Sequence, residues 1–249
     1  MSIETISDFI KNTFAVTGKS QAVIAVSGGI DSAASLTLLA RALPKTQIWP
    51  LLLPYERQDM TDAVTILDFV GIEDGNRKTI NIASMVETTC KSLQITDGEV
   101  LRKGNLMARM RMVAVFDYAK SKDALVVGTE NKSEHHLGYF TRFGDSASDL
   151  EPLVGLYKTQ VRQLAQEMQL PSVFLEKAPS AGLWTGQSDE TEMGFSYELA
   201  DQVLTLLIDQ QLPAAQILPQ FEANQQELVQ KVIDRVEAMK FKLEVPYYE

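Results

Sequence analysis

The sequence of 249 residues contains a single cysteine, Cys90. One thiol cannot form an internal disulfide, a zinc cluster or a CxxC redox pair, which fits a reducing compartment, and Cys90 is predicted to be a packed thiol. Long apolar runs are missing as well, since none approaches the roughly 20 residues needed to span a bilayer. The first residues, MSIE, lack the basic and then apolar layout of a signal peptide. We therefore expect a soluble cytoplasmic protein without a membrane partner.

Positive charge is in the minority. The chain has 23 Lys and Arg residues against 33 Asp and Glu residues, a formal net charge of −10. This field repels polyanions, whereas nucleic-acid binders gain affinity by neutralising phosphates. We therefore expect no nucleic-acid partner, although a local basic pocket remains compatible with a small phosphorylated ligand. The two histidines, His135 and His136, are adjacent in the sequence, so on a helix they point apart and do not chelate a metal together.

Short apolar segments alternate with amphipathic helical segments over the first part of the chain. After an opening helix that ends near Gly18, the predicted strands are 22–26, 48–53, 78–82 and 125–128, and the predicted helices are 33–43, 63–70 and 105–120. This alternation predicts an α/β fold, a doubly wound and mainly parallel sheet flanked by helices. The carboxyl ends of parallel strands share one edge, which is where ligands bind in such sheets.

The pattern becomes helical after about residue 155, with predicted helices at 157–168, 197–209 and 225–240. We therefore expect one domain over residues 1–249, with an α/β core at about 20–155 and a C-terminal helical extension at about 156–249. Three segments have little periodicity, 92–104, 131–151 and 176–194, and are predicted to be loops. The last of them is a candidate lid over the sheet edge.

The predicted helix 105–120 is apolar on nearly every side. A helix of this kind is normally buried, either in the core or at a contact between subunits. Both alternatives stay open here, and the second one predicts a homodimer.

The strongest chemical signal is SGGIDS, between a predicted strand and a predicted helix; its residues are Ser27, Gly28, Gly29, Ile30, Asp31 and Ser32. Paired glycines permit positive φ and leave room for a phosphate, which backbone N–H groups and the following helix N-terminus attract. Asp31 would repel phosphates unless it binds a divalent cation such as Mg²⁺. The alternative is a tight turn with Asp31 or Ser32 as a helix N-cap.

A second signal follows the predicted strand 125–128, in the run TENKSE. Thr129 ends the strand, and Glu134 is close enough in sequence to reach the same sheet edge as Asp31. Two carboxylates that converge on phosphates form a reasonable Mg²⁺ site. The alternative is a solvated loop.

The loop resembles the SGGxDS pyrophosphate loop of the ATP-pyrophosphatase superfamily, and further segments resemble the ammonia-dependent NAD synthetase family. These segments lie in order between about residues 20 and 200, and they are KGNLMARMRM (103–112), GYFTRFGD (138–145), DLEPL (149–153), GLYK (155–158), PSAGLW (179–184) and QSDE (187–190). The resemblance implies the adenine-nucleotide alpha-hydrolase-like fold.

The resemblance also implies roles for particular residues. ATP would be bound by residues 27–32 and by Thr129, Lys158 and Ser180. Mg²⁺ would be held by Asp31 and Glu134, and the catalytic group would be Asp31, Glu134 and Lys158. The deamido-dinucleotide, nicotinic acid adenine dinucleotide, would be bound at a dimer interface by a last set of residues, which comprises Arg109, Arg142, Asp149 and Lys242.

The sequence departs from the family pattern at two positions. Leu52 stands where the family has an arginine for ATP, with Arg57 as a candidate substitute, and Phe241 stands where the family has the first residue of a basic pair. Only about 25 residues precede the loop, so we expect no glutaminase domain. Free ammonia or a separate glutaminase would then supply the nitrogen.

The implied reaction is the adenylation of a carboxylate by ATP, followed by attack of ammonia to give NAD, AMP and pyrophosphate. Enzymes that thiolate tRNA need more cysteines than Cys90, and tRNA-lysidine enzymes need a basic surface. GMP synthetases lack the segments at 138–145 and 179–184. An ATP-binding regulatory domain without catalysis would need neither Glu134 nor a second-substrate pocket.

Overall fold

The structure is a computed structural model that describes residues 1–180 and 186–246. Its sheet has four parallel strands in the order β3-β2-β1-β4; they are β1 (Gln21–Ala25), β2 (Ile48–Leu52), β3 (Lys78–Thr79) and β4 (Ala124–Val127). The predicted parallel α/β fold is confirmed. The strand predicted at 78–82 is shorter in the structure, where β3 is an exposed edge strand of two residues. After β3, the chain continues beside β2 through single hydrogen bonds, from the Ile80 amide to the Leu52 carbonyl and from the Ile82 amide to the Pro54 carbonyl.

The strand order reverses at β1. The chain runs outward from β1 through β2 to β3, and then returns to pair β4 with the other side of β1. In open parallel sheets, ligands bind beyond the carboxyl ends of the strands at such a reversal. The segments that follow β1 and β4 are the two segments that carry the chemical signals of the sequence.

One face of the sheet is covered by α4 (Ala83–Ser92) and α5 (Val100–Lys122). Val23, Leu51 and Val126 point to this face and pack with side chains of α4 and α5, including Cys90. Cys90 is buried, so the prediction of a packed thiol is confirmed. The helix predicted at 105–120 is longer, since it begins at Val100 within a predicted loop. It is also not buried all round, because Val113 on its outward side is 45% exposed.

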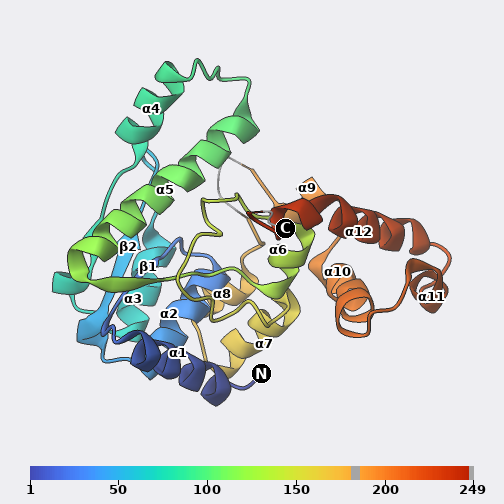
Figure 1. Cartoon of the computed structure of the whole chain (residues 1–249), viewed down its shortest axis with the longest axis horizontal. Helices are drawn as coiled ribbons and strands as arrows, with labels where there is room; N and C mark the ends of the chain where they lie inside the picture. The colour runs from blue at the N-terminus through green and yellow to red at the C-terminus, as the bar shows by residue number, and fades with distance from the viewer. Residues whose placement is uncertain (181–185, 247–249) are drawn as a thin grey trace.

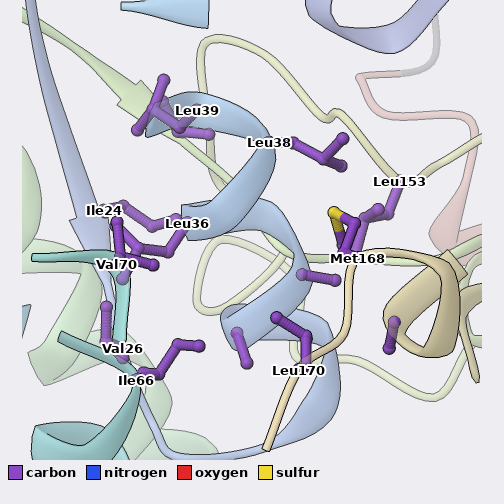
Figure 2. Close-up of a cluster of buried hydrophobic side chains, with 14 of the residues drawn as sticks. Ile24, Val26, Leu36, Leu38, Leu39, Ile66, Val70, Leu153, Met168 and Leu170 are labelled. Atoms are coloured by element: carbon purple, nitrogen blue, oxygen red, sulfur yellow. The ribbon is translucent and has the colours of Figure 1, made fainter. Parts of the chain in front are cut away.

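The opposite face is covered by the helices α1 (Ile3–Thr17), α2 (Ile30–Ala42), α3 (Thr61–Val70), α7 (Lys158–Glu167) and α8 (Ser172–Glu176). Figure 2 shows α2 at the centre of this layer, with Leu36 directed toward Ile24 of β1 and Leu38 toward Leu153 and Met168. Because α2 is enclosed on both sides, its first turn has little freedom to move. This fixes the end of the helix that follows the SGGIDS loop.

The C-terminal helices lie beside the sheet, at the right of Figure 1. They are α9 (Asp189–Met193), α10 (Tyr197–Leu204) with a π-helical turn η3 (Thr205–Asp209), α11 (Ala214–Ile217) and α12 (Gln226–Met239). They share an apolar cluster with Leu137 of α6 (Lys132–Leu137), a helix inside the predicted loop 131–151. Short 3-10 turns complete the chain: η1 (Lys45–Gln47), η2 (Asp74–Asn76), η4 (Leu218–Gln220) and η5 (Lys240–Lys242). Among the described residues, no helix is long and apolar enough to cross a membrane.

Candidate active site

The SGGIDS loop connects β1 to α2 at the carboxyl edge of the sheet. Gly28 has φ +82°, and a Cβ there would lie 2.9 Å from the backbone nitrogen of Ala63 and 2.9 Å from Cβ of Asp62. The backbone therefore both needs the left-handed region and passes too close to α3 for any side chain. These two constraints explain why the position is glycine.

The loop is closed by its own serines. The Ser32 hydroxyl accepts from the Ser27 amide (3.3 Å) and donates to the Gly29 carbonyl (2.9 Å), while Ser27 Oγ accepts from the Gly29 amide (3.2 Å). Gly29 is the N-cap of α2, and no side chain of the described residues caps this helix end. The alternative with Asp31 or Ser32 as the N-cap is therefore wrong. The first amides of α2 are oriented for an anion.

Asp31, Glu134 and Lys158 meet at this loop. Lys158 Nζ lies 2.5 Å from Asp31 Oδ2 and 3.0 Å from Glu134 Oε1. The Lys158 side chain is 3% exposed, whereas Asp31 and Glu134 retain 16% and 17% exposure. One buried ammonium thus joins two carboxylates on α2 and α6, the helices that follow the neighbouring strands β1 and β4.

Glu134 is placed by the start of α6. Asn131 is the N-cap of α6 and forms a capping box with Glu134, in which Asn131 Oδ1 accepts from the Glu134 amide at 3.0 Å. The same Asn131 side chain donates to Asp31 Oδ1 at 2.9 Å. Sequence reasoning missed Asn131, although the spacing Asn-x-x-Glu was an available signal for a helix start.

The electrostatics favour a further cation. Burial raises the pKa of Glu134 above its usual value, against the opposing effect of Lys158 and with an added contribution from Asp31. Burial also disfavours the ammonium, but Asp31 and Glu134 outweigh it and raise the pKa of Lys158, which keeps it protonated. Because Lys158 does not offset the effect of burial on Glu134, a second cation at this site would favour the ionised form of Glu134.

Lys158 is held at its backbone as well. Its amide donates to Ser133 Oγ at 2.8 Å, and Ser133 Oγ donates to Asp201 Oδ1 at 2.5 Å. The next amide, that of Thr159, donates to Asp201 Oδ2 at 2.9 Å. The Tyr197 ring, also on α10, has Lys158 Nζ 5.3 Å from its centroid. Sequence reasoning missed these contacts of α10.

A pocket of about 200 Å³, which we call the second pocket, lies on a different side of α6 from the Asp31–Lys158–Glu134 group. His135 lines it one residue after Glu134, because consecutive helical side chains point about 100° apart. His135 Nδ1 is 3.1 Å from Glu130 Oε1, and its ring stacks on Phe140. The pocket also includes Arg142 and Lys242, so it combines aromatic rings with cations.

The residues predicted for the dinucleotide differ in their surroundings. Lys242 donates to the carbonyls of Gly138 (2.6 Å) and Phe140 (2.7 Å), and the Arg142 guanidinium lies 5.2 Å from the centroid of the Phe241 ring. Arg109 Nε donates to the Arg142 carbonyl at 3.3 Å.

Asp149 lies apart from these cations, at the end of β4. Its Oδ2 accepts from the Val126 amide at 2.6 Å, and it is not among the residues that line the pocket.

The remaining predicted positions lie around the sheet edge. Thr129 follows β4, and Ser180 is exposed just before the residues that the structure leaves undescribed. Residues 181–184 of the PSAGLW segment, and part of the candidate lid 176–194, lie outside the described residues. Leu52 is buried in the core, and Arg57 is exposed.

The donor set fits a magnesium ion. Asp31 and Glu134 offer hard carboxylate oxygens that already share one cation, and Mg²⁺ in nucleotide sites takes one or two carboxylates with phosphate oxygens and water. Within the described residues, no group of three or more His, Cys, Asp or Glu side chains forms a metal cage. The site therefore suits an ion that arrives with a phosphorylated ligand.

Known proteins resemble this chain over nearly its whole length. The profile of the family NAD synthase matches residues 2–246. The NH(3)-dependent NAD(+) synthetase of Pyrococcus furiosus is 42% identical over 93% of this chain and 86% of its own length. That of Fusobacterium nucleatum is 38% identical over 96% and 91%.

Two solved structures are also similar. The NH3-dependent NAD synthetase from Campylobacter jejuni has a TM-score of 0.82 and 30% identity, covering 99% of this chain and 96% of that one. The NMN synthetase from Francisella tularensis has a TM-score of 0.83 and 33% identity with the same coverage. The fold and these relatives define a ligase built on a parallel α/β sheet. The chain belongs to the NAD synthase family.

Proposed function

We propose that this chain converts nicotinic acid adenine dinucleotide to NAD with ATP, Mg²⁺ and ammonia, as the last step of NAD biosynthesis in the cytoplasm. The observation that carries the proposal is the Asp31–Lys158–Glu134 group at the end of the glycine loop. The named activity of the relatives from Pyrococcus furiosus and Fusobacterium nucleatum supports it.

ATP binds at the loop, with its phosphates against the first turn of α2. Gly28 and Gly29 leave space for the phosphates, and the N-terminal end of α2, which no side chain of the described residues caps, attracts their charge. Thr129 and Ser180 complete the nucleotide site. Lys158 supplies a buried positive charge that does not titrate near neutral pH, because both of its carboxylate partners keep it protonated.

Asp31 and Glu134 would hold Mg²⁺, which would neutralise phosphate charge and orient the phosphates. The two carboxylates keep this position because Asn131 fixes Asp31 and caps the helix that carries Glu134. Preorganised charges of this kind stabilise charge that develops in the transition state.

The second substrate binds in the pocket on the other side of α6, where Arg142 and Lys242 meet its phosphates. Arg109 and Asp149 lie outside the lining of this pocket and would contact the parts of the substrate that extend beyond it. Its carboxylate oxygen forms a bond to the α-phosphorus of ATP, and the bond from that phosphorus to the bridging oxygen breaks, so that pyrophosphate leaves. The ammonia lone pair then forms the C–N bond, the C–O bond to AMP breaks, and the nitrogen loses a proton to water. Binding both polyanions side by side lowers the entropic part of the activation free energy.

A homodimer would complete this site. The outward side of α5 exposes Val113 beside Arg109, so a partner that covers α5 also approaches a predicted substrate contact. Sedimentation at micromolar concentration tests this: a dimer is expected, and a monomer would remove the proposal of an interface at α5.

A second candidate substrate is the mononucleotide, nicotinic acid mononucleotide. Two observations favour testing it: the likeness to the NMN synthetase structure, and Phe241 in place of one cation expected for the dinucleotide. The Phe241 ring supports Arg142 instead of adding a charge of its own. A higher kcat/KM for the mononucleotide than for the dinucleotide would replace the first assignment.

The test uses purified protein, ATP, Mg²⁺ and the dinucleotide, with ammonium or glutamine as the nitrogen source. NAD formation is followed with alcohol dehydrogenase, and the mononucleotide is assayed in parallel by its amide product. We expect NAD with ammonium and very little with glutamine. Pyrophosphate release that requires a different carboxylate would keep the ATP site and reject the substrate.

A further inference from the structure

The helix α10 contacts both ends of Lys158, although it belongs to the C-terminal helices. Tyr197 and Asp201 are four residues apart on α10, so they lie on the same face of the helix. The Tyr197 ring lies 5.3 Å from Lys158 Nζ, and Asp201 reaches the beginning of α7, where Lys158 is the first residue. The position of Lys158 thus depends on a helix that belongs to the C-terminal helices.

The Asp201 carboxylate satisfies the first amides of α7, which lack partners within their own helix. It accepts directly from the Thr159 amide at 2.9 Å, and through the Ser133 hydroxyl it also holds the Lys158 amide. A carboxylate at a helix N-terminus is also favoured by the helix dipole. Asp201 is 5% exposed and Ser133 is fully buried, so water does not compete for these bonds.

The Ser133 hydroxyl also connects two helices. Ser133 lies in the first turn of α6, directly before Glu134, and it accepts from the first residue of α7. One hydroxyl and one carboxylate therefore set the spacing between the helix that carries Glu134 and the helix that carries Lys158. A change in this spacing would lengthen the 3.0 Å contact between the Lys158 ammonium and the Glu134 carboxylate.

Resting on the proposed function, we propose that Asp201, acting through Ser133, is a positioning residue that fixes Lys158 and Glu134 relative to each other for the adenylation step. Asp201 touches neither substrate nor reacting atom in this assignment. Its contribution is to kcat, because misplaced charges stabilise the transition state poorly, whereas ATP contacts made by the loop remain. The helical extension is in this way part of the reaction centre.

The experiment compares the full-length variants Asp201→Asn and Ser133→Ala with the matched control Tyr157→Phe. The control also removes a bond between the start of α7 and the C-terminal helices, the 3.0 Å bond from the Tyr157 hydroxyl to Asp209. It leaves the amides of Lys158 and Thr159 held as before. Pyrophosphate release at saturating ammonium gives kcat and the KM for ATP, and thermal unfolding gives stability.

We expect kcat of Asp201→Asn and of Ser133→Ala to fall by about 10- to 100-fold, the loss that accompanies a small misplacement of reacting groups. The KM for ATP should change less than about threefold, and Tyr157→Phe should keep the wild-type kcat. The double variant should lose no more than the worse single variant, since both changes cut one chain of bonds.

A wild-type kcat in Asp201→Asn, with only a lower unfolding temperature, would overturn the inference. If Asp201→Asn does not fold, Ser133→Ala provides the test: a lower kcat with little change in the KM for ATP supports the inference, and a wild-type kcat overturns it. A wild-type enzyme that makes no NAD rejects the proposed function instead. In that case a crystal structure of Ser133→Ala decides: Lys158 Nζ still within 3.0 Å of both carboxylates would contradict the positioning role.

Discussion

The two sides of α6 are built differently. On the side of the loop, charged groups bind one another: Lys158 contacts Asp31 and Glu134, and Asn131 holds Asp31. On the side of the second pocket, Lys242 is bound by backbone carbonyls and the Arg142 guanidinium lies against an aromatic ring. The first side is a preformed charge network. In the second pocket, Arg142 and Lys242 form no ion pair with a carboxylate of the described residues, although Glu130 also lines the pocket, and both cations suit an anionic substrate.

The largest expected effect comes from removing the centre of the network. Lys158→Met should lower pyrophosphate release by about 100- to 1,000-fold, the range that follows the loss of a preorganised charge donor. The matched control is Lys132→Met, since Lys132 is also ion-paired, with Asp209, but lies outside the network. Steady-state pyrophosphate assays decide, and equal losses in both variants would contradict the special place of Lys158.

The next prediction compares two glycines with positive φ, of which only Gly28 lies close to a neighbouring helix. Gly28→Ala should destabilise the protein by more than Gly18→Ala, which places a side chain at φ +68° with nothing within 4 Å. The control should cost about 1–2 kcal/mol for the left-handed backbone alone. At Gly28 the Cβ also meets the Ala63 backbone at 2.9 Å, so α3 must move and the KM for ATP should rise. Urea unfolding and ATP titration measure both; equal behaviour of the two variants would refute the close approach.

Changing the second pocket should leave the ATP side intact. Arg142→Gln should raise the KM for the dinucleotide by about 10- to 100-fold, the effect of losing a charge-assisted hydrogen bond, with little change in the KM for ATP. Arg162→Gln is the control, because Arg162 pairs with the exposed Glu198 on another face. A parallel rise of both KM values would show that the two sides of α6 are not independent.

The smallest effect concerns stability and pH. Burial raises the pKa of Glu151 to about 8. The folded state therefore holds this proton more tightly than the unfolded chain, so the Glu151 contribution to stability is lost as pH rises from the ordinary glutamate pKa of 4.5 to about 8. Glu151→Gln keeps an acceptor for the Glu130 amide, and should be more stable relative to wild type at pH 9 than at pH 5. Thermal unfolding at both pH values measures this, and a constant difference would contradict the raised pKa.

The sequence predicts the glycine loop and its charged residues better than it predicts the residues that position them. The glycine loop follows β1 as expected, because a paired glycine between apolar runs is a local signal. The helix predicted at 33–43 begins earlier, at Ile30, so residues 30–32 form its first turn. The sequence predicts a loop where the structure has α6, since six residues with Lys, Glu and two His have no apolar periodicity. Its capping box, from Asn131 to Glu134, was the available signal.

Asp201 could not be found in this way. A lone acidic residue on an amphipathic helix normally faces solvent, and its partner Ser133 is 68 residues away in sequence. Only the packing of α10 against α6 and α7 brings them together. Phe241 likewise makes a contact that is distant in the sequence, with the Arg142 guanidinium.

The most direct test of the account is a single-turnover mixture of the enzyme, ATP, Mg²⁺ and the dinucleotide without ammonium. We expect one equivalent of pyrophosphate per active site, released only when the dinucleotide is present, and loss of this release in Asp31→Asn and Glu134→Gln. Pyrophosphate released at the same rate without the dinucleotide, or unchanged in both variants, would contradict a joint reaction of the two sides of α6.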